Sequence, residues 1–309
     1  MDKLLIVGGF GFIGKNLVEY LYEKYNIVII DKKIDKEFFI KFKKELKFYQ
    51  YDFITEEMFK LHKIIEKENP NYIINLISIV TTERNLEIFE EMIKINLNVL
   101  LKLFNCSKKL SSLKLFIQFG SGEEYGNILP PFKETDRENP NSPYALAKQL
   151  TTNSSIMLNK NYDFPIVVVR PGNLFGKYQN ANKFIPYTIS QLLKNEEINI
   201  TLGEQKRDFI YTLDFSRGIE LLMENYKYFI GEIVNLSSGK SISLKEIVLF
   251  SKEYIKSNSK INFGAISYRE NEIKNFLLDI SKFEKGVKQK FEIDIMQRIK
   301  EYIDYLKGD

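Results

Sequence analysis

The chain has 309 residues, of which 44% are hydrophobic and 28% are charged. This balance is typical of a folded globular protein and excludes a chain that is mainly disordered. A single hydrophobic core seldom grows beyond about 250 residues, so we expect one large two-lobed unit or two coupled domains.

Charge and reactive side chains exclude further classes of protein. Lys and Arg number 45 against 41 Asp and Glu, and the net charge of +4 is spread through mixed-sign stretches, so we expect no nucleic acid partner. Cys106 is the single cysteine and His62 the single histidine. These counts exclude disulfide scaffolds, Cys/His zinc sites and His-dependent catalytic groups that need a second such residue, and we expect no metal site.

We also expect no membrane-spanning segment and no secretory signal. Residues 1–8 have too short an apolar run for a secretory signal, and no run approaches the roughly 20 apolar residues of a membrane span. We therefore expect a cytoplasmic protein with no membrane partner.

Short runs rich in Val and Ile alternate with longer segments of helical periodicity, which predicts a parallel sheet with helical crossovers. In chain order we expect strands at 3–7, 27–30, 47–51, 72–77, 114–119, 166–170 and 232–236. The expected helices span 12–24, 56–68, 86–109, 143–160, 186–194, 213–226, 244–256 and 295–306. The predicted fold class is α/β, a Rossmann-type doubly wound parallel sheet with a smaller, mixed C-terminal lobe.

A glycine-rich turn joins the first expected strand to the first helix, with glycines at Gly8, Gly11 and Gly14. A pyrophosphate at this helix N-terminus would meet free N–H groups and the positive end of the helix dipole. Asp31, 23 residues after Gly8, can accept hydrogen bonds from both ribose hydroxyls and would repel a 2′-phosphate. The pattern predicts a dinucleotide site that prefers NAD to NADP, a preference that the neighbouring lysines 32 and 33 weaken. A tight turn without a ligand is the alternative.

Tyr144 and Lys148 are four residues apart, so on a helix their side chains leave the same face one turn from each other. Ser142 and Pro143 just before them are typical of a helix start. An ammonium group beside a phenol stabilises the phenolate, and a positively charged nicotinamide would do the same, so we expect a lowered pKa for Tyr144. Tyr144 is a candidate general acid or base, with a solvated helix face as the alternative.

Ser121 lies between two glycines at the carboxyl end of a predicted strand, where open parallel sheets bind ligands. Its hydroxyl can donate a hydrogen bond to a substrate oxygen that gains negative charge. The alternative is a structural role in the turn.

Together these residues resemble the extended short-chain dehydrogenase/reductases, the NAD-dependent epimerase/dehydratase family that acts on nucleotide sugars. The resemblance rests on the three glycines, on Ser121 with Tyr125-Gly126 and on Tyr144 with Lys148, and it continues through Asn75-Leu76, Asn96, 170–176, 207–211 and 235–239. It implies that Ser121, Tyr144 and Lys148 are the catalytic triad. It also implies a homodimer and an NAD site formed by Gly8, Gly11, Phe12, Ile13, Gly14, Asp31, Asp52, Phe53, Asn96, Tyr144 and Lys148.

The resemblance extends to the substrate, a nucleotide-diphosphate sugar. We assign Arg207 and Arg269 to the diphosphate because a guanidinium fork binds phosphate oxygens in two-pronged fashion, with surface salt bridges as the alternative. Glu272 can hold the nucleotide ribose, and Asn173 matches the family's contact with the substrate phosphate. By this assignment, residues 1–172 and 205–240 form the NAD-binding Rossmann domain, and 173–204 and 241–309 form the sugar-nucleotide lobe.

The resemblance implies an oxidoreductase that moves hydride between NAD(H) and sugar C4. The stretch 263–273 is most similar to the family's 4-ketoreductases, and a 4-epimerase with tightly bound NAD is the closest alternative. Glu123 stands where the 4,6-dehydratases carry a catalytic glutamate, but Gly122 replaces the aspartate that many of them use as the acid for the leaving C6 hydroxyl. Dehydration therefore ranks below the other two reactions. A non-catalytic NAD-binding protein remains as an alternative of a different class.

Overall fold

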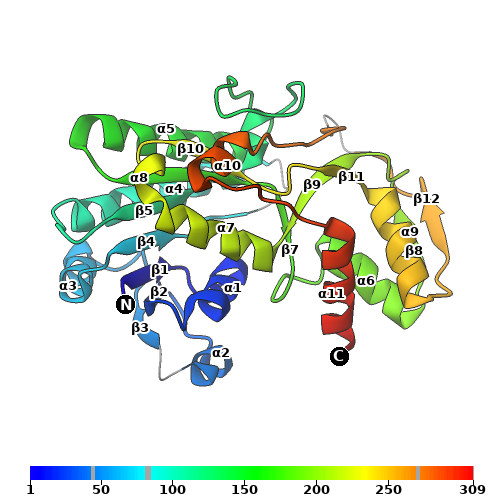
Figure 1. The fold of residues 1–309 in the computed structure, drawn as a ribbon, viewed down its shortest axis with the longest axis horizontal. Coiled ribbons are helices and arrows are strands. Elements are labelled where there is room, and N and C mark those ends of the chain that lie inside the picture. The colour runs from blue at the N-terminus through cyan, green and yellow to red at the C-terminus, as the bar shows by residue number, and fades with distance from the viewer. Residues whose placement is uncertain (43–45, 81–84, 269–271, 309) are drawn as a thin grey trace.

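The structure is a computed structural model that describes residues 1–42, 46–80, 85–268 and 272–308. Within these ranges, seven parallel strands form the main sheet in the order β10-β6-β5-β4-β1-β2-β3 (Figure 1). They are Lys3–Val7 (β1), Asn26–Asp31 (β2), Leu46–Gln50 (β3), Tyr72–Asn75 (β4), Leu115–Phe119 (β5), Ile166–Pro171 (β6) and Ile233–Leu236 (β10). The strand order reverses between β1 and β4, and sheets of this kind bind ligands outside the carboxyl ends of the strands at such a point.

Helices cover both faces of this sheet, which explains why its central strands are apolar along their whole length. Leu4 and Ile6 of β1 pack on the face covered by the first group of helices, and Leu5 and Val7 pack on the opposite face. The first group consists of α1 (Phe12–Leu21) and α7 (Thr212–Glu224). The second consists of α3 (Met58–Glu68), α4 (Glu87–Ser107) and α5 (Pro143–Tyr162).

A smaller lobe lies beside the main sheet, at the right of Figure 1. One of its sheets has the order β11-β9-β7, in which β9 (Lys206–Tyr211) pairs in parallel with β7 (Asn173–Phe175) and antiparallel with β11 (Ser241–Ser243). The other pairs β8 (Ile198–Ile200) with β12 (Ile261–Phe263). Its helices are α6 (Phe184–Lys194), α9 (Leu244–Ile255) and α11 (Ile295–Lys307). Four short helical segments complete the described chain: α2 (Lys36–Lys41), the 3-10 helix η1 (Gly122–Tyr125), α8 (Tyr226–Phe229) and α10 (Ser281–Val287).

The predicted fold class is confirmed. Each of the seven strands of the main sheet lies within two residues of its predicted bounds. The first helix is shorter than predicted and ends at Leu21, and a turn in which the carbonyl of Leu21 accepts from the amides of Lys24 and Tyr25 leads into β2. The described part of the chain contains no helix with the length and apolar character needed to cross a membrane.

Candidate active site

The glycine-rich turn forms a tight cradle between β1 and α1. Gly8 has a φ of +84°, a conformation that side chains disfavour, and its amide donates to the carbonyl of Ile30 at 2.8 Å. A Cβ on Gly14 would lie 2.6 Å from both the Gly8 carbonyl oxygen and the Cα of Gly9. Glycine is therefore required at both positions for the helix N-terminus to come this close to the strand. This open, backbone-lined helix start fits the pyrophosphate of a dinucleotide.

Asp31 lies at the end of β2, beside this cradle. Its Oδ2 accepts from the amide of Phe10 at 3.0 Å, and its Oδ1 accepts from the amide of Lys32 at 2.7 Å. Each carboxylate oxygen has two lone pairs, so one on each oxygen is left for the ribose hydroxyls. Asp31, Gly8 and Gly11 line a surface cavity of about 730 Å³. The carboxylate is thus placed where the sequence predicts it.

The other residues predicted to contact the cofactor from outside the glycine turn include Asp52, Phe53 and Asn96. The Lys32 ammonium pairs with Asp52 at 2.9 Å, whereas Lys33 lines the cavity beside Asp31. Asp52 and Phe53 are not among the residues that line the two described cavities, and their contact with the cofactor stays a prediction. Asn96 is buried on α4, and within the described ranges neither its Oδ1 nor its Nδ2 has a hydrogen-bond partner. Asn96 also lines neither of the two described cavities, and its contact with the cofactor stays a prediction.

A cleft of about 860 Å³ joins the cradle to the smaller lobe. It brings together most of the residues that the sequence assigns to catalysis, cofactor and substrate. Those that line it are Gly8, Gly11, Phe12, Ile13, Gly14, Ser121, Glu123, Tyr144, Lys148, Asn173, Arg207 and Glu272. Arg269 lies outside the described residues.

The three candidate catalytic residues meet in the middle of this cleft. Ser142 caps α5 by accepting from the amide of Ala145 at 3.1 Å, which starts the helix so that Tyr144 and Lys148 share one face. The side chains of Ser121, Tyr144 and Lys148 all line this cleft, and Ser121 is close enough to the Tyr144 phenol to lower its pKa. The Lys148 ammonium donates to the carbonyl of Phe119 at 3.0 Å and lies 6.0 Å from the centre of the Tyr144 ring.

Burial governs the titration of this group. It lowers the pKa of Lys148 to about 8, and the negative charge of Glu124 works against that shift. Burial raises the pKa of Tyr144 above its ordinary value of 10.0, and the side chain of Ser121 only partly opposes it. In the protein alone the pKa of Tyr144 is therefore raised, because desolvation of the phenolate dominates. The lowered pKa expected beside a bound nicotinamide stays a prediction.

At the other end of the cleft, two predicted substrate residues contact each other. The Nη1 of Arg207 on β9 donates to the carbonyl of Ile273 at 2.6 Å, and its Nη2 pairs with the carboxylate of Glu272. Asn173 donates to the backbone carbonyl of Asp208 at 3.4 Å. Arg207 thus forms a salt bridge at the wall of the cleft, as in the alternative stated for it, and its contact with the substrate diphosphate stays a prediction.

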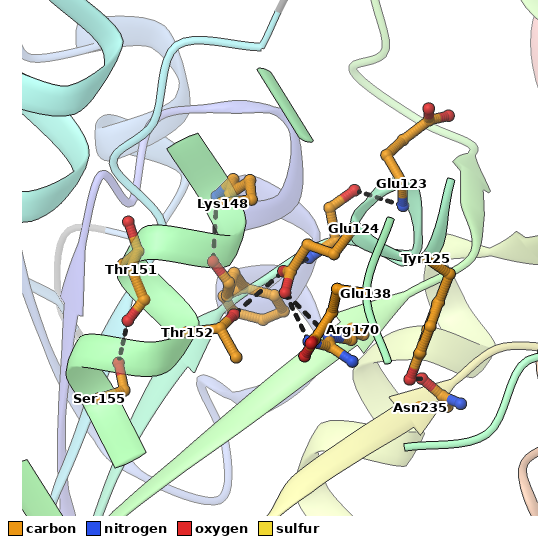
Figure 2. A network of polar contacts seen from close by, with 12 residues as sticks. Glu123, Glu124, Tyr125, Glu138, Lys148, Thr151, Thr152, Ser155, Arg170 and Asn235 are labelled. Atoms are coloured by element: carbon orange, nitrogen blue, oxygen red, sulfur yellow. Dashed lines mark hydrogen bonds and ion pairs between the residues drawn. The ribbon is translucent and has the colours of Figure 1, made fainter. Parts of the chain in front are cut away.

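Two features of the cleft are missed by the sequence reasoning. Phe276 lines the cleft against Gly122, although nothing in its own segment marks it as a site residue. A buried polar network centred on Glu124 and Arg170 (Figure 2) contacts the backbone of Ser121. The signal for the network is Arg170 itself, a charge in an otherwise apolar strand, because a charge buried there requires a partner.

Comparison with known proteins agrees with this geometry. The family model described as NAD dependent epimerase/dehydratase family matches residues 4–237. CDP-abequose synthase of Salmonella muenchen is 28% identical over 281 residues, covering 88% of this chain and 87% of that protein. A putative UDP-glucose 4-epimerase of Methanocaldococcus jannaschii is 27% identical over 317 residues, covering 99% of each.

A solved structure is also similar over the whole length. The UDP-N-acetylglucosamine 4-epimerase from Methanobrevibacter ruminantium M1, in complex with UDP-N-acetylmuramic acid, has a TM-score of 0.88 at 25% identity and covers 99% of this chain and 98% of that chain. The chain belongs to the NAD-dependent epimerase/dehydratase family, and NAD is its cofactor.

Proposed function

We propose that this member of the family is a 4-keto sugar-nucleotide reductase. NADH, when bound, supplies the hydride that reduces C4 of the sugar. Tyr144 donates the proton that converts the C4 oxygen to a hydroxyl, and Ser121 donates a hydrogen bond to the same oxygen as negative charge develops on it. The Lys148 ammonium stabilises the tyrosinate that proton donation leaves behind. The position of Ser121 and Tyr144 in the wall of the same cleft supports this assignment, because both donors can then reach one substrate oxygen.

The observation that carries the choice of a reductase is the apolar wall at Gly122. A Cβ on Gly122 would lie 2.4 Å from Cζ of Phe276 and 3.2 Å from the carbonyl oxygen of Pro171. Phe276 is 2% exposed and is held edge-on by Phe132, with ring centres 5.5 Å apart. A side chain at position 122 would therefore have to displace a packed aromatic ring.

This wall disfavours dehydration. Elimination of the C6 hydroxyl needs a proton donor beside it, and position 122, which supplies that acid in many dehydratases of the family, has neither a side chain nor room for one here. A methyl group at C6 packs against the Phe276 ring, whereas a C6 hydroxyl gains nothing from that ring and has to turn to the Pro171 carbonyl or to Glu123. The geometry supports a substrate that is already 6-deoxy and carries the ketone at C4.

A 4-epimerase is the second candidate, because the similarity to two epimerases extends over the whole chain. Both reactions share the hydride transfer at C4. They differ in stoichiometry, since a reductase consumes one NADH per product, whereas an epimerase returns its hydride to the sugar and leaves NAD unchanged.

The test is to determine by mass spectrometry which nucleotide co-purifies with the protein and whether its NAD is oxidised or reduced, followed by a screen of nucleotide sugars. We expect NADH oxidation in equal amount with reduction of a nucleotide 4-keto-6-deoxyhexose. Interconversion of C4 epimers without net NADH oxidation would instead establish the epimerase. Loss of one water from a 6-hydroxy nucleotide hexose incubated with NAD would establish a dehydratase and make Glu123 its base. Absence of all three would leave a non-catalytic NAD-binding protein.

A further inference from the structure

We propose that Glu124 is a positioning residue, which fixes the backbone of Ser121 relative to the helix that carries Tyr144 and Lys148. This proposal rests on the function proposed above in one respect, because that function places the Ser121 hydroxyl at the C4 oxygen. The neighbouring Glu123 lines the cleft, whereas Glu124 is fully buried behind it.

The Glu124 carboxylate accepts four hydrogen bonds, two on each oxygen (Figure 2). Its Oε1 accepts from the backbone amide of Ser121 at 2.7 Å and from the hydroxyl of Thr152 at 3.0 Å. Its Oε2 accepts from Nε and Nη2 of Arg170 at 3.0 and 2.6 Å. Burial raises the pKa of Glu124 and the charge of Arg170 opposes it, and the ionised form is the one that can accept four donors.

Each donor belongs to a different element that carries part of the active site. Ser121 follows β5, and Thr152 lies on α5 one turn beyond Lys148. Arg170 lies near the end of β6, directly before Pro171, Gly172 and Asn173, which line the cleft. The Glu124 carboxylate therefore connects the backbone of Ser121, the helix α5 that carries Tyr144 and Lys148, and the end of β6 that leads into the wall of the cleft.

The rest of the network holds Arg170 in place. Its Nη2 also donates to Glu138 at 2.6 Å, and its guanidinium carbon lies 4.6 Å from the centre of the Tyr125 ring. The Tyr125 hydroxyl donates in turn to Asn235 of β10 at 2.9 Å. Arg170 is fully buried, so its position is set by these partners rather than by solvent.

A neutral amide cannot replace this carboxylate, although it has the same size. Glutamine offers one acceptor oxygen, and donors face position 124 from both sides, so its amide group would meet either Arg170 or the pair formed by Ser121 and Thr152. The carboxylate is also packed closely on the end of β5, since a Cβ on Gly120 would lie 2.5 Å from Oε1 of Glu124.

The test compares Glu124→Gln with a matched control, Asp214→Asn. Asp214 is also a buried carboxylate that accepts a two-pronged arginine, from Arg298 at 2.6 and 2.9 Å, but it joins α7 to α11 and does not line the cleft. Both changes lower stability for the same reason. Only Glu124→Gln is expected to lower kcat, by at least about tenfold, because a misplacement of roughly 1 Å at the reacting group is enough for such a loss.

A second readout separates positioning from general loss of stability. The groups facing the Lys148 ammonium are the Phe119 carbonyl of β5, the Tyr144 ring of α5 and the negative charge of Glu124. Glu124 raises the pKa of Lys148, so in Glu124→Gln the alkaline limb of kcat/KM should move to lower pH. In Asp214→Asn that limb should stay in place.

A third readout does not depend on any substrate. Hydrogen exchange of the Ser121 amide, measured by NMR, should be faster in Glu124→Gln than in Asp214→Asn after correction for global stability. If this exchange, kcat and the pH profile are the same in both variants, the proposal is wrong. If the wild type turns over no nucleotide sugar, the proposed function fails, and the amide exchange still decides the positioning role.

A milder variant covers the case in which Glu124→Gln does not fold. Thr152→Val removes one donor to Oε1 and leaves the pair with Arg170 intact. We expect a smaller fall in kcat and a rescue by Thr152→Ser, which restores the hydroxyl. Unchanged kcat and unchanged Ser121 amide exchange in Thr152→Val would also contradict the proposal.

Discussion

At its cofactor end the cleft is formed by backbone, and at its substrate end it is formed by side chains. Gly8, Gly11 and Gly14 lie in one short stretch of the chain. Each contributes only backbone to the cleft, because glycine has no side chain. The substrate end joins Arg207 to Glu272 and sets Phe276 against Gly122, and these residues are far apart in the chain. A backbone site tolerates almost no change, whereas a side-chain site can be altered by replacing one partner and adjusting the other.

The largest effect is expected where the two ends meet, at Tyr144. Tyr144→Phe removes the hydroxyl that donates the proton and keeps the ring, so it should lower turnover at least about a hundredfold, the usual scale for loss of a general acid. NADH affinity, measured by titration of its fluorescence, should be unchanged. Full activity of this variant on a confirmed substrate would show that another group carries the proton.

At the cofactor end, Gly14→Ala places a methyl group 2.6 Å from backbone atoms of Gly8 and Gly9. Backbone cannot yield as a side chain can, so the loop must move away from α1. We expect the Kd for NADH to rise at least about tenfold, which corresponds to roughly 1.4 kcal/mol. Calorimetric titration measures it, and an unchanged Kd would mean that the cradle does not hold the pyrophosphate.

At the substrate end, Gly122→Ala meets the tip of the Phe276 ring rather than backbone. It should lower the free energy of unfolding by about 1–3 kcal/mol without weakening NADH binding. The double change Gly122→Ala with Phe276→Leu should recover part of this loss, because the shorter side chain makes room. Urea denaturation of the single and double variants measures the coupling. If the losses of unfolding free energy in Gly122→Ala and Phe276→Leu simply add in the double variant, the Phe276 ring does not limit the size of a side chain at position 122.

The same contrast explains what the sequence could predict. The main sheet, the glycine turn and the pair Tyr144 and Lys148 follow from local periodicity and spacing, because each depends on residues close together in the chain. Strand β9 was not predicted: it begins with three charged residues, Lys206, Arg207 and Asp208, and has no regular alternation. The contact of Phe276 with Gly122 depends on tertiary packing, which no local pattern records.

The buried network around Glu124 and Arg170 could be predicted from the sequence only in part. The charge of Arg170 in an apolar strand indicates that a buried partner exists, but two adjacent glutamates follow Ser121 and either could be that partner. The turn of η1 decides between them by directing Glu124 inward to Arg170, while Glu123 lines the cleft. Such a choice depends on the orientation of one helical turn rather than on composition.

A change of pH is expected to have a smaller effect on kcat/KM, and it tests the role of Lys148 beside Tyr144. Lys148 is protonated below its pKa of about 8 and neutral above it, so the positive charge beside Tyr144 is lost as pH rises. The kcat/KM of the reductase should therefore fall as pH rises through about 8, rather than near the ordinary lysine value of 10.5. A pH profile measures this. A flat profile through about pH 9 would contradict the assignment, and Lys148→Arg, which cannot lose its proton in this range, should shift the fall to higher pH.

The smallest effect concerns the choice between NADH and NADPH, and it tests the role of Asp31 at the cofactor end of the cleft. Asp31 is expected to repel a 2′-phosphate, while the Lys32 ammonium is paired with Asp52 and Lys33 lines the cavity beside Asp31. Asp31→Ala removes the repulsion and leaves Lys33 in place, so the preference for NADH should narrow. Part of the NADH affinity should also be lost with the ribose contacts. The ratio of the two Kd values measures the change, and Lys33→Ala is the matched control, since it should widen the preference instead. Tighter binding of NADPH than of NADH by the wild type would show that Asp31 does not hold the ribose.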